Sequence, residues 1–378
     1  MSNEHYIYQG GQKLRRGWTT GSCAAAAAQA AALLLLTGVA PATIALHTPA
    51  GLTFQLPVEQ PQCTEGAASC TVRKDAGDDP DATDGVRITA TVRRAASGVQ
   101  IEGGAGVGRV TRPGLAVPVG EAAINPAPRA QIRAAVERAM RESGYTGGLT
   151  VVIEVEDGAA LAEQTYNAHL GIVGGISILG TSGVVEPMSE KALVDTIRLE
   201  LDSLYAAGQR IAFLCPGNYG ADFARDTLGL DLAHAVKCSN YIGDTLDHAV
   251  YRGFREILLV GHAGKLVKLA AGVMNTHSSV ADGRQEIITA HAALCGAGRD
   301  TLAALMDAVS VDACIDHLEM AGLREAVMAR IGQAIAQRLA RRLRGRAHAE
   351  FVMFTARYGI LAQSPGAPAL CARAKEET

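Results

Sequence analysis

The stretch that decides the fold of the first part of the chain is GWTTGSCAAAAAQAAALLLLTG, residues 17–38. Alanine and leucine have high helix propensity, so residues 24–36 predict a long apolar helix that Thr37 and Gly38 end. Its start carries a glycine and hydroxyl side chains: Thr19, Thr20, Gly21 and Ser22. Free amides and hydroxyls at a helix start suit an anionic group such as a carboxylate or phosphate. A well-capped core helix is an equally good interpretation.

The residues around this helix leave export open as an alternative. Arg15 and Arg16 precede the apolar run, and the small residues Ala40 and Ala42 follow it, as in a twin-arginine export signal. One interpretation of that pattern is an exported protein that binds a tetrapyrrole or another anion. The run is shorter than the roughly 20 apolar residues of a membrane span. We expect a cytoplasmic protein with no membrane partner.

Composition narrows the class of partner. A chain of 378 residues favours two domains rather than one core. Its 35 basic and 38 acidic residues are too balanced for a protein that neutralises nucleic-acid phosphates, so we expect a small molecule and no nucleic acid. Eight cysteines without CxxC pairs fit a reducing compartment. The histidines form no local ligand pair, so no protein-bound metal is expected, and a homo-oligomer is possible.

The first part of the chain predicts a mixed α/β domain, residues 1–147. Alternating or β-branched segments between breakers predict strands at Thr43–His47, Leu52–Val58, Ser69–Lys74, Val86–Arg94 and Gly98–Glu102. A second helix should run over Pro126–Ser143, with Asn125 as its cap and Gly144 as its stop. Gly147 and Gly148 then make a plausible boundary.

Residues 148–378 predict an α/β domain with a mostly parallel sheet and helices on its faces, because short apolar strands alternate with longer helices. The expected strands are Leu149–Val155, Ile176–Leu179, Ile211–Leu214, Ile257–Val260 and Phe351–Phe354. The expected helices are Ser189–Ala207, Ile242–Arg252, Gln285–Cys295 and Leu323–Leu343.

Three of these strands run directly into glycine-rich turns, which in an open α/β sheet lie at the carboxyl edge where ligands bind. The predicted cofactor-binding residues are therefore Gly174, Gly175, Ser177, Gly180, Thr181, Ser182, Gly217, Asn218, Tyr219, Gly261 and His262. Close helix packing is the alternative use of such glycines. GHAGKL, from Gly261, is similar to a shortened phosphate loop but lacks the hydroxyl residue after Lys265, so a phosphate-handling enzyme is a second alternative.

Two charged segments of the first part are candidates for substrate binding. The segment KDAGDDPDATDG, residues 74–85, carries Asp78, Asp79 and Asp81, which could bind a hard cation or position cationic groups, although a solvated turn is the default interpretation. The segment GGAGVGRVTRPG, from Gly103, lacks the helix that a dinucleotide fingerprint needs. Its Arg109 and Arg112 are candidate carboxylate partners, and its glycines would let backbone approach a ligand or a neighbouring strand.

Taken in order, several long motifs resemble the CbiD family of cobalt-precorrin-5B C1-methyltransferases. They are GWTTGSCAAAAA, KDAGDDPDATDG, IEGGAGVGRVTRPGLAVPVGEAAINP, LGIVGGISILGTSGVVEPMS, CPGNYG and KCSNYIGDTLDHA. The similar blocks extend from about Leu14 to Ala297. Ala168 and His169 depart from the proline and arginine that are more usual before LGIVGG.

The resemblance implies methyl transfer from S-adenosylmethionine to C-1 of a cobalt-containing macrocycle, with cobalt carried by the substrate. It implies a smaller first domain similar to a ribosomal-protein type and a Rossmann-like second domain. We expect the anionic macrocycle to meet the hydroxyl-rich turn at Thr19–Ser22, the two arginines and the aspartates, and the methyl donor to meet the glycine-rich turns. No catalytic acid or base follows from the residues.

Overall fold

The computed structural model describes residues 5–377 and divides into two compact units, Met1–Glu190 and Lys191–Thr378. Each unit has a sheet and a hydrophobic core of its own, so the expectation of two α/β domains is confirmed. The boundary predicted after Gly147 is wrong. The strand that begins at Gly148 pairs with two strands of the first unit, because its alternating apolar residues complete that sheet.

The main sheet of the first unit has the order β6-β7-β8-β11-β9, and β11 is parallel only to β9. Its strands are β6 (Glu59–Cys63), β7 (Ala67–Arg73), β8 (Arg87–Ala95), β9 (Val99–Gly103) and β11 (Gly148–Val155). Buried and partly exposed residues alternate along β8 and β11, so one face of this sheet carries the core.

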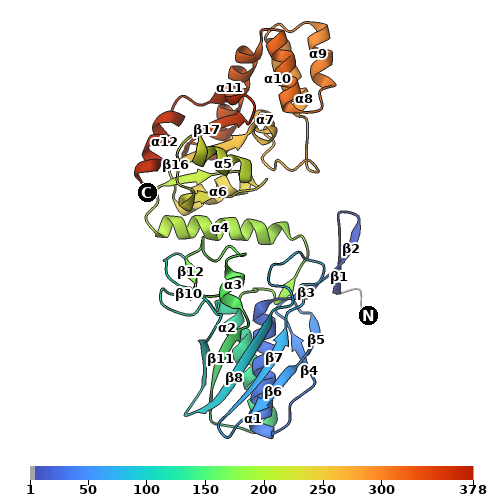
Figure 1. Ribbon diagram of the computed structural model, residues 1–378, viewed down its shortest axis with the longest axis vertical. Helices are drawn as coiled ribbons and strands as arrows, with labels where there is room; N and C mark the ends of the chain where they lie inside the picture. Colours follow the sequence, from blue (N-terminus) through green and yellow to red (C-terminus); the bar gives the residue numbers. More distant parts are fainter. Residues whose placement is uncertain (1–4, 378) are drawn as a thin grey trace. The chain divides into compact units, whose positions relative to one another are not determined.

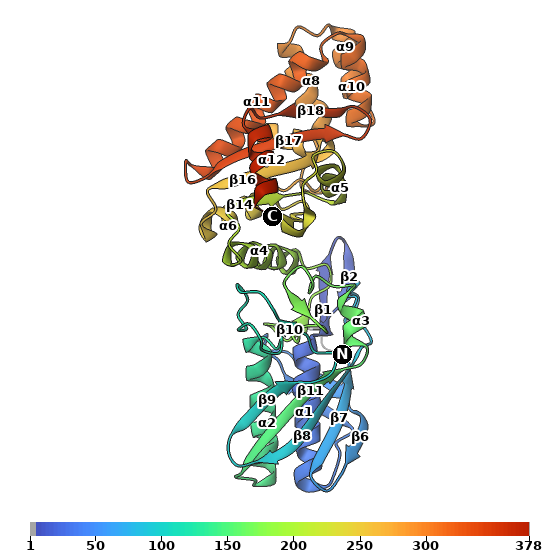
Figure 2. The same cartoon turned by 60° about the vertical axis from the view of Figure 1, so that its left-hand side comes forward.

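Helices α1 (Thr20–Thr37) and α2 (Pro126–Ser143) pack against each other and against this sheet (Figures 1 and 2). Every residue of α1 from Thr20 to Ala32 is buried, because the small alanine side chains let the sheet and α2 approach closely. Among the described residues, α1 is the one helix long and apolar enough to cross a membrane, and 78% of it is buried inside the protein.

Shorter elements complete the first unit, and most of them pair in twos. The pairs are β1 (Tyr6–Gln9) with β2 (Gln12–Arg15), β4 (Thr43–His47) with β5 (Thr53–Pro57), β3 (Gly17–Trp18) with β13 (Val184–Val185), and β10 (Arg109–Val110) with β12 (Ile172–Val173). A short helix, α3 (Gly158–Ala162), follows β11.

The sheet of the second unit has the order β15-β14-β16-β17-β18, in which only β18 is antiparallel to its neighbour. Its strands are β14 (Ile211–Leu214), β15 (Ala235–Val236), β16 (Glu256–His262), β17 (His348–Thr355) and β18 (Gly359–Gln363). The prediction of a mostly parallel sheet is confirmed.

Helices cover both faces of this second sheet and make a three-layer unit. Alternate residues of each strand enter opposite cores: Leu214 and Leu259 enter one, and Phe213 and Val260 enter the other. The first core contains α4 (Glu190–Ala206), α6 (Ile242–Arg252), α7 (Ala263–Ala270), α8 (Arg284–Leu294), α10 (Val311–Met320) and α11 (Arg324–Leu343). The second contains α5 (Asn218–Asp226) and α12 (Ala367–Glu376), while α9 (Arg299–Met306) packs on α8 and α10.

Replacing Ala27 with leucine tests the close packing of α1. Ala27 has no exposed surface, so the larger side chain must push the sheet or α2 away, and the free energy of unfolding should fall by about 1–3 kcal/mol. Urea unfolding followed by the fluorescence of Trp18, the single tryptophan, reports on this unit. The control is Ala130→Leu on the exposed side of α2, which should change stability by less than about 0.5 kcal/mol. Equal effects of the two variants would contradict this account.

Candidate functional site

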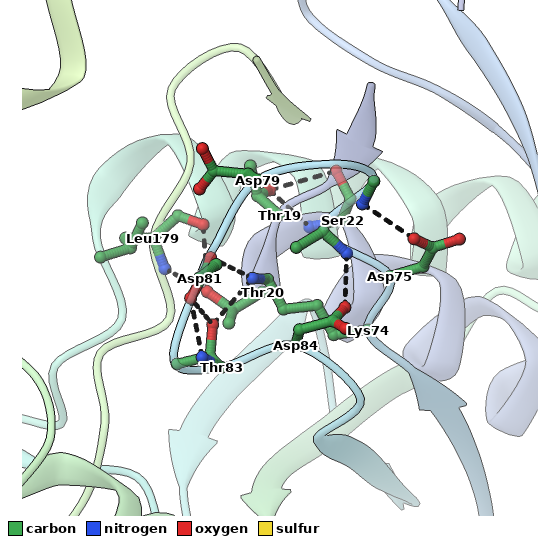
Figure 3. A network of polar contacts seen from close by, with 12 residues as sticks. Thr19, Thr20, Ser22, Lys74, Asp75, Asp79, Asp81, Thr83, Asp84 and Leu179 are labelled. Carbon is green, nitrogen blue, oxygen red and sulfur yellow. Dashed lines mark hydrogen bonds and ion pairs between the residues drawn. The ribbon is translucent and has the colours of Figure 1, made fainter. Parts of the chain in front are cut away.

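The start of α1 is held by a glycine-rich segment from the far end of the same unit (Figure 3). The Thr20 hydroxyl oxygen lies 3.3 and 3.2 Å from the carbonyl oxygens of Ser177 and Leu179 and accepts the N–H of Leu179 at 2.9 Å. The Ser22 hydroxyl donates to the carbonyl of Gly183 at 2.7 Å. These groups are buried, so the hydroxyls predicted to meet a ligand meet the chain's own backbone instead.

Thr19 and Gly21 are engaged in the same way. Thr19 caps α1 by accepting the N–H of Ser22, and the N–H of Gly21 donates to the carbonyl of Leu179 at 2.9 Å. A Cβ on Gly180 would lie 2.2 Å from the Thr19 hydroxyl, so glycine is required where the segment crosses the helix start. The capped core helix, which the sequence left as an equal alternative, is what the structure contains.

The segment from Gly174 to Ser182 belongs to the first unit, and the strand predicted at Ile176–Leu179 is absent. Ile176 and Ile178 make only isolated bridges, to Val107 and Ile124. This segment therefore does not end a strand of the parallel sheet, and its predicted grouping with Gly217 and Gly261 at one sheet edge is wrong. The apolar run is buried in the core of the first unit, and this burial gives it the composition of a buried strand.

Individual residues of this segment have different surroundings. A Cβ on Gly175 would lie 2.2 Å from the carbonyl oxygen of Gly106, so the two glycine-rich segments touch through their backbones. The buried Ser177 hydroxyl donates to Asn167 Oδ1 at 3.0 Å. The remaining predicted residues lie at or near the surface: Gly174, Gly180, Thr181 and Ser182.

The aspartate-rich turn, whose Lys74–Asp81 ion pair is drawn in Figure 3, also bonds to the chain before and after α1. The side chain of Lys74, only 2% exposed, forms an ion pair with Asp81. Burial alone would raise the pKa of Asp81, but the charge and hydrogen bond of Lys74 outweigh it, so that pKa lies below its ordinary value. Asp78 accepts the N–H of Arg15, and Asp79 accepts the N–H of Met188. The turn thus holds two segments in place: the one that contains Arg15, before α1, and the one that contains Met188, well after it.

No group of three or more potential ligands suited to a metal ion occurs among residues 5–377. Arg109 and Arg112 are exposed, in and just after β10. One guanidinium nitrogen of Arg109 donates to the carbonyl of Gly120 at 3.0 Å, and neither arginine forms an ion pair with a described residue. Their charges are available to an anionic ligand. His169 is also exposed, beside the ring of Tyr166.

The sheet of the second unit has a topological switch point between β14 and β16. These strands are adjacent and parallel, but the helix that follows β14 packs on one face and the helix that follows β16 packs on the other. In open α/β sheets a crevice forms outside the carboxyl ends of two such strands. Five of the predicted residues lie at these ends: Gly217, Asn218, Tyr219, Gly261 and His262.

The residues at the switch point include a glycine without a side chain, an exposed tyrosine and a histidine that can donate a hydrogen bond. Gly217 precedes α5 with φ of 103°, in the region that favours glycine, and Tyr219 is 76% exposed. His262 caps α7: its Nδ1 accepts the N–H of Gly264 at 3.1 Å, which places the proton of the neutral ring on Nε2. Burial lowers the pKa of His262, against an opposing effect of Asp312. His262 is thus a neutral hydrogen-bond donor at Nε2.

The sequence pattern did not single out Lys265 as a binding residue, since GHAGKL fails as a phosphate loop. The structure places its ammonium group 3.2 Å from the carbonyl oxygen of Ser239, which follows β15. The one feature of the sequence that could have indicated Lys265 is its position shortly after the end of a predicted strand.

The second unit has an open, mostly parallel sheet with a switch point, the arrangement in which α/β proteins of this class bind small molecules at the carboxyl edge. A family model described as CbiD matches residues 7–187, and one described as CbiD, C-terminal domain, matches residues 275–365. The chain belongs to the CbiD family.

Relatives match nearly the whole chain. A cobalt-precorrin-5B C(1)-methyltransferase of Ruminiclostridium cellulolyticum is 48% identical over 93% of this chain and 92% of its own. The protein of that name from Alkaliphilus metalliredigens is 41% identical over 99% and 98%. A solved structure, the cobalamin biosynthesis protein CbiD from Archaeoglobus fulgidus, is 30% identical, with a TM-score of 0.41, and the match covers 74% of this chain and 87% of that one.

A buried carboxyl group on α4 belongs to the same unit as the switch point. Glu200 is 5% exposed, and burial raises its pKa to about 7, although the charge and backbone N–H of Lys237 act in the opposite direction. Lys237 joins β15 to the turn that contains Ser239. Because the folded state holds this proton more tightly than the unfolded chain does, Glu200 favours folding at low pH and that advantage disappears as pH rises through about 7.

Replacing Glu200 with glutamine should therefore stabilise the protein at pH 8 relative to the wild type, by up to about 3 kcal/mol, and change stability little at pH 4.5. The measurement is urea unfolding followed by circular dichroism at several pH values between these limits. The exposed Glu190→Gln, on the same helix, serves as the control and should show no such pH-dependent difference. A stability difference that does not change with pH would show that Glu200 ionises normally.

Proposed function

We propose that this protein transfers the methyl group of S-adenosylmethionine to C-1 of cobalt-precorrin-5B, giving cobalt-precorrin-6A in anaerobic cobalamin biosynthesis. The observation that carries the proposal is the 41–48% identity, over more than nine tenths of the chain, with relatives named for this reaction. The parallel sheet of the second unit, with its switch point, is consistent with binding of a methyl donor at the carboxyl ends of the strands.

The donor site in this proposal is the switch point of the second unit, formed by Gly217, Asn218, Tyr219, Gly261 and His262. Gly217 leaves room for a ligand near the backbone, and the first N–H groups of α5 suit a carboxylate or hydroxyl oxygen. The exposed ring of Tyr219 offers a surface for an adenine base. Residues 174–182 lie in the other unit, and the donor site that we propose does not include them.

When bound, S-adenosylmethionine supplies an electrophilic methyl group on sulfur, and the ring carbon of the macrocycle is the nucleophile. The protein's task is therefore to position the two and to keep water away. In the tautomer fixed by Gly264, His262 offers Nε2–H as a donor and has no free lone pair there, so it suits orientation better than proton removal.

For the macrocycle we propose Arg109 and Arg112, whose free charges match the carboxylates of the substrate. Thr19–Ser22 and the aspartates at 78, 79 and 81 hold the first unit together, and we assign them no direct contact with substrate. We further propose a cytoplasmic enzyme that needs no nucleic acid, membrane or protein-bound metal, with cobalt carried by the substrate. A homo-oligomer is compatible with this reaction.

The two alternatives have less support. Export would require removal of a helix that lies in the core of the first unit and inside the segment matched by the CbiD model. A phosphate-handling enzyme would require a hydroxyl residue after Lys265, and Leu266 stands there instead, fully buried.

Incubating the purified protein with S-adenosylmethionine and cobalt-precorrin-5B tests the reaction. We expect one added methyl group, detected by mass spectrometry and assigned to C-1 by NMR with a labelled methyl donor. A mixture without protein is the control. Failure to form a methylated product, or a methyl group at another carbon, would contradict the proposal.

Tyr219→Ala tests the donor site. Stacking of a base on an aromatic side chain contributes about 1–3 kcal/mol, so the variant should bind S-adenosylhomocysteine roughly tenfold more weakly in calorimetry. Tyr219 is 76% exposed, so its loss should not change the unfolding temperature. Tyr251→Ala is the matched control, since that tyrosine is 83% exposed on α6 away from the strand ends. If the Tyr219 variant binds S-adenosylhomocysteine with unchanged affinity, the donor does not bind against Tyr219 and the proposed site is wrong.

A further inference from the structure

Three strand-to-helix connections of the second unit meet at one side chain, Lys265. Its ammonium group donates to the carbonyl of Ser239, in the connection after β15, at 3.2 Å. It also lies against Gly217, in the connection after β14, where an added Cβ would stand 3.4 Å from the nitrogen. Lys265 itself follows β16, in the first turn of α7. The ammonium group of Lys265 is thus held at the switch point by the connections that follow β14, β15 and β16.

The backbone is adapted to this arrangement at two positions. Ser239 has φ of 50°, in the left-handed region that residues other than glycine rarely adopt. That conformation belongs to the residue whose carbonyl accepts the Lys265 hydrogen bond. Gly217 also has positive φ, and a side chain there would occupy the space beside the ammonium group. Ser239 thus supplies the acceptor that positions the charge, and the glycine at 217 leaves the space beside the ammonium group without a side chain.

Lys265 has no acidic partner within the part of the chain that the structure describes. Its ammonium group donates to a neutral carbonyl, and no carboxylate of a described residue lies within ion-pair distance. The neighbouring Lys268 is a contrast, since it donates to the carbonyls of Thr276 and Ala281 and lies 3.7 Å from Asp282. Burial lowers the pKa of Lys265, as expected for a cation removed from water without a counter-ion.

We infer that Lys265 is a specificity-determining residue that binds the carboxylate of the methyl donor's amino-acid portion. A single ammonium group matches a single carboxylate, and a partly buried cation without a counter-ion gains most from an anionic ligand. The donor's amino-acid end would then lie between Gly217 and Ser239, and its adenosine would extend toward Tyr219. This inference rests on the proposed function and goes beyond it by naming which group of the donor is recognised.

The test compares two ligands on the full-length protein by calorimetry: S-adenosylhomocysteine and its decarboxylated analogue. For Lys265→Gln we expect S-adenosylhomocysteine to bind about 10- to 100-fold more weakly, the effect of losing one charge-assisted hydrogen bond. The analogue, which has no carboxylate, should bind the variant within about threefold of its affinity for the wild type. In turnover assays the variant should show a raised KM for S-adenosylmethionine with little change in kcat.

Two further variants keep the result interpretable. Lys265→Arg retains the charge and should recover part of the preference for the carboxylate-bearing ligand, which a purely structural role would not produce. Lys191→Gln removes an exposed lysine from the same unit and should affect neither ligand. Circular dichroism of each variant reports whether it is folded.

Each outcome has a defined meaning. If Lys265→Gln weakens both ligands equally, or neither, Lys265 does not recognise the carboxylate and the inference fails while the proposed donor stands. If the wild-type protein binds neither ligand, the donor assignment fails, and the inference fails with it. Selective loss of the carboxylate-bearing ligand supports both.

Discussion

The first unit depends on a helix whose start has no access to water. Helix α1 is buried from Thr20 to Ala32, and a buried helix start carries backbone N–H groups that need acceptors. The carbonyl of Leu179 accepts the N–H of Gly21, and the N–H of Leu179 in turn donates to the hydroxyl of Thr20. The hydroxyl of Thr19 accepts the N–H of Ser22. The alanine-rich helix permits close packing, and the glycine-rich segment supplies hydrogen-bond partners for the start of that helix. The buried helix start and the glycine-rich segment therefore depend on each other.

The second unit depends on a different constraint, the two-residue alternation of its strands. Because successive residues of β14 and β16 enter opposite cores, helices must cover both faces of the sheet. The connections after β14 and β16 therefore run to opposite faces, which in open α/β sheets is where ligands bind, outside the carboxyl ends of the strands. Gly217, Ser239 and Lys265 reach one point for this topological reason, although they lie far apart in the sequence.

Sequence reasoning succeeded where local rules act and failed where tertiary context decides. Pro126–Ser143 and Ile242–Arg252 have the predicted bounds, since proline and glycine mark helix ends strongly. The run 176–179 has the composition of a buried strand, yet in the structure it forms only isolated bridges. The hydroxyls at 19–22 posed a similar problem, because a carbonyl of the same chain and a ligand oxygen satisfy them equally well. Only the fold distinguishes the two acceptors.

That distinction gives a physical criterion for separating lysines with a structural role from a lysine that is available to a ligand in this chain. Lys74 and Lys268 are more buried than Lys265, but the chain supplies their partners, so each stabilises a turn. Lys265 has one neutral acceptor, and Gly217 places no side chain beside its ammonium group. Removing a cation from water is unfavourable unless something compensates for it. When the chain keeps such a cation near a sheet edge and gives it no counter-ion, the missing compensation is most simply provided by the ligand.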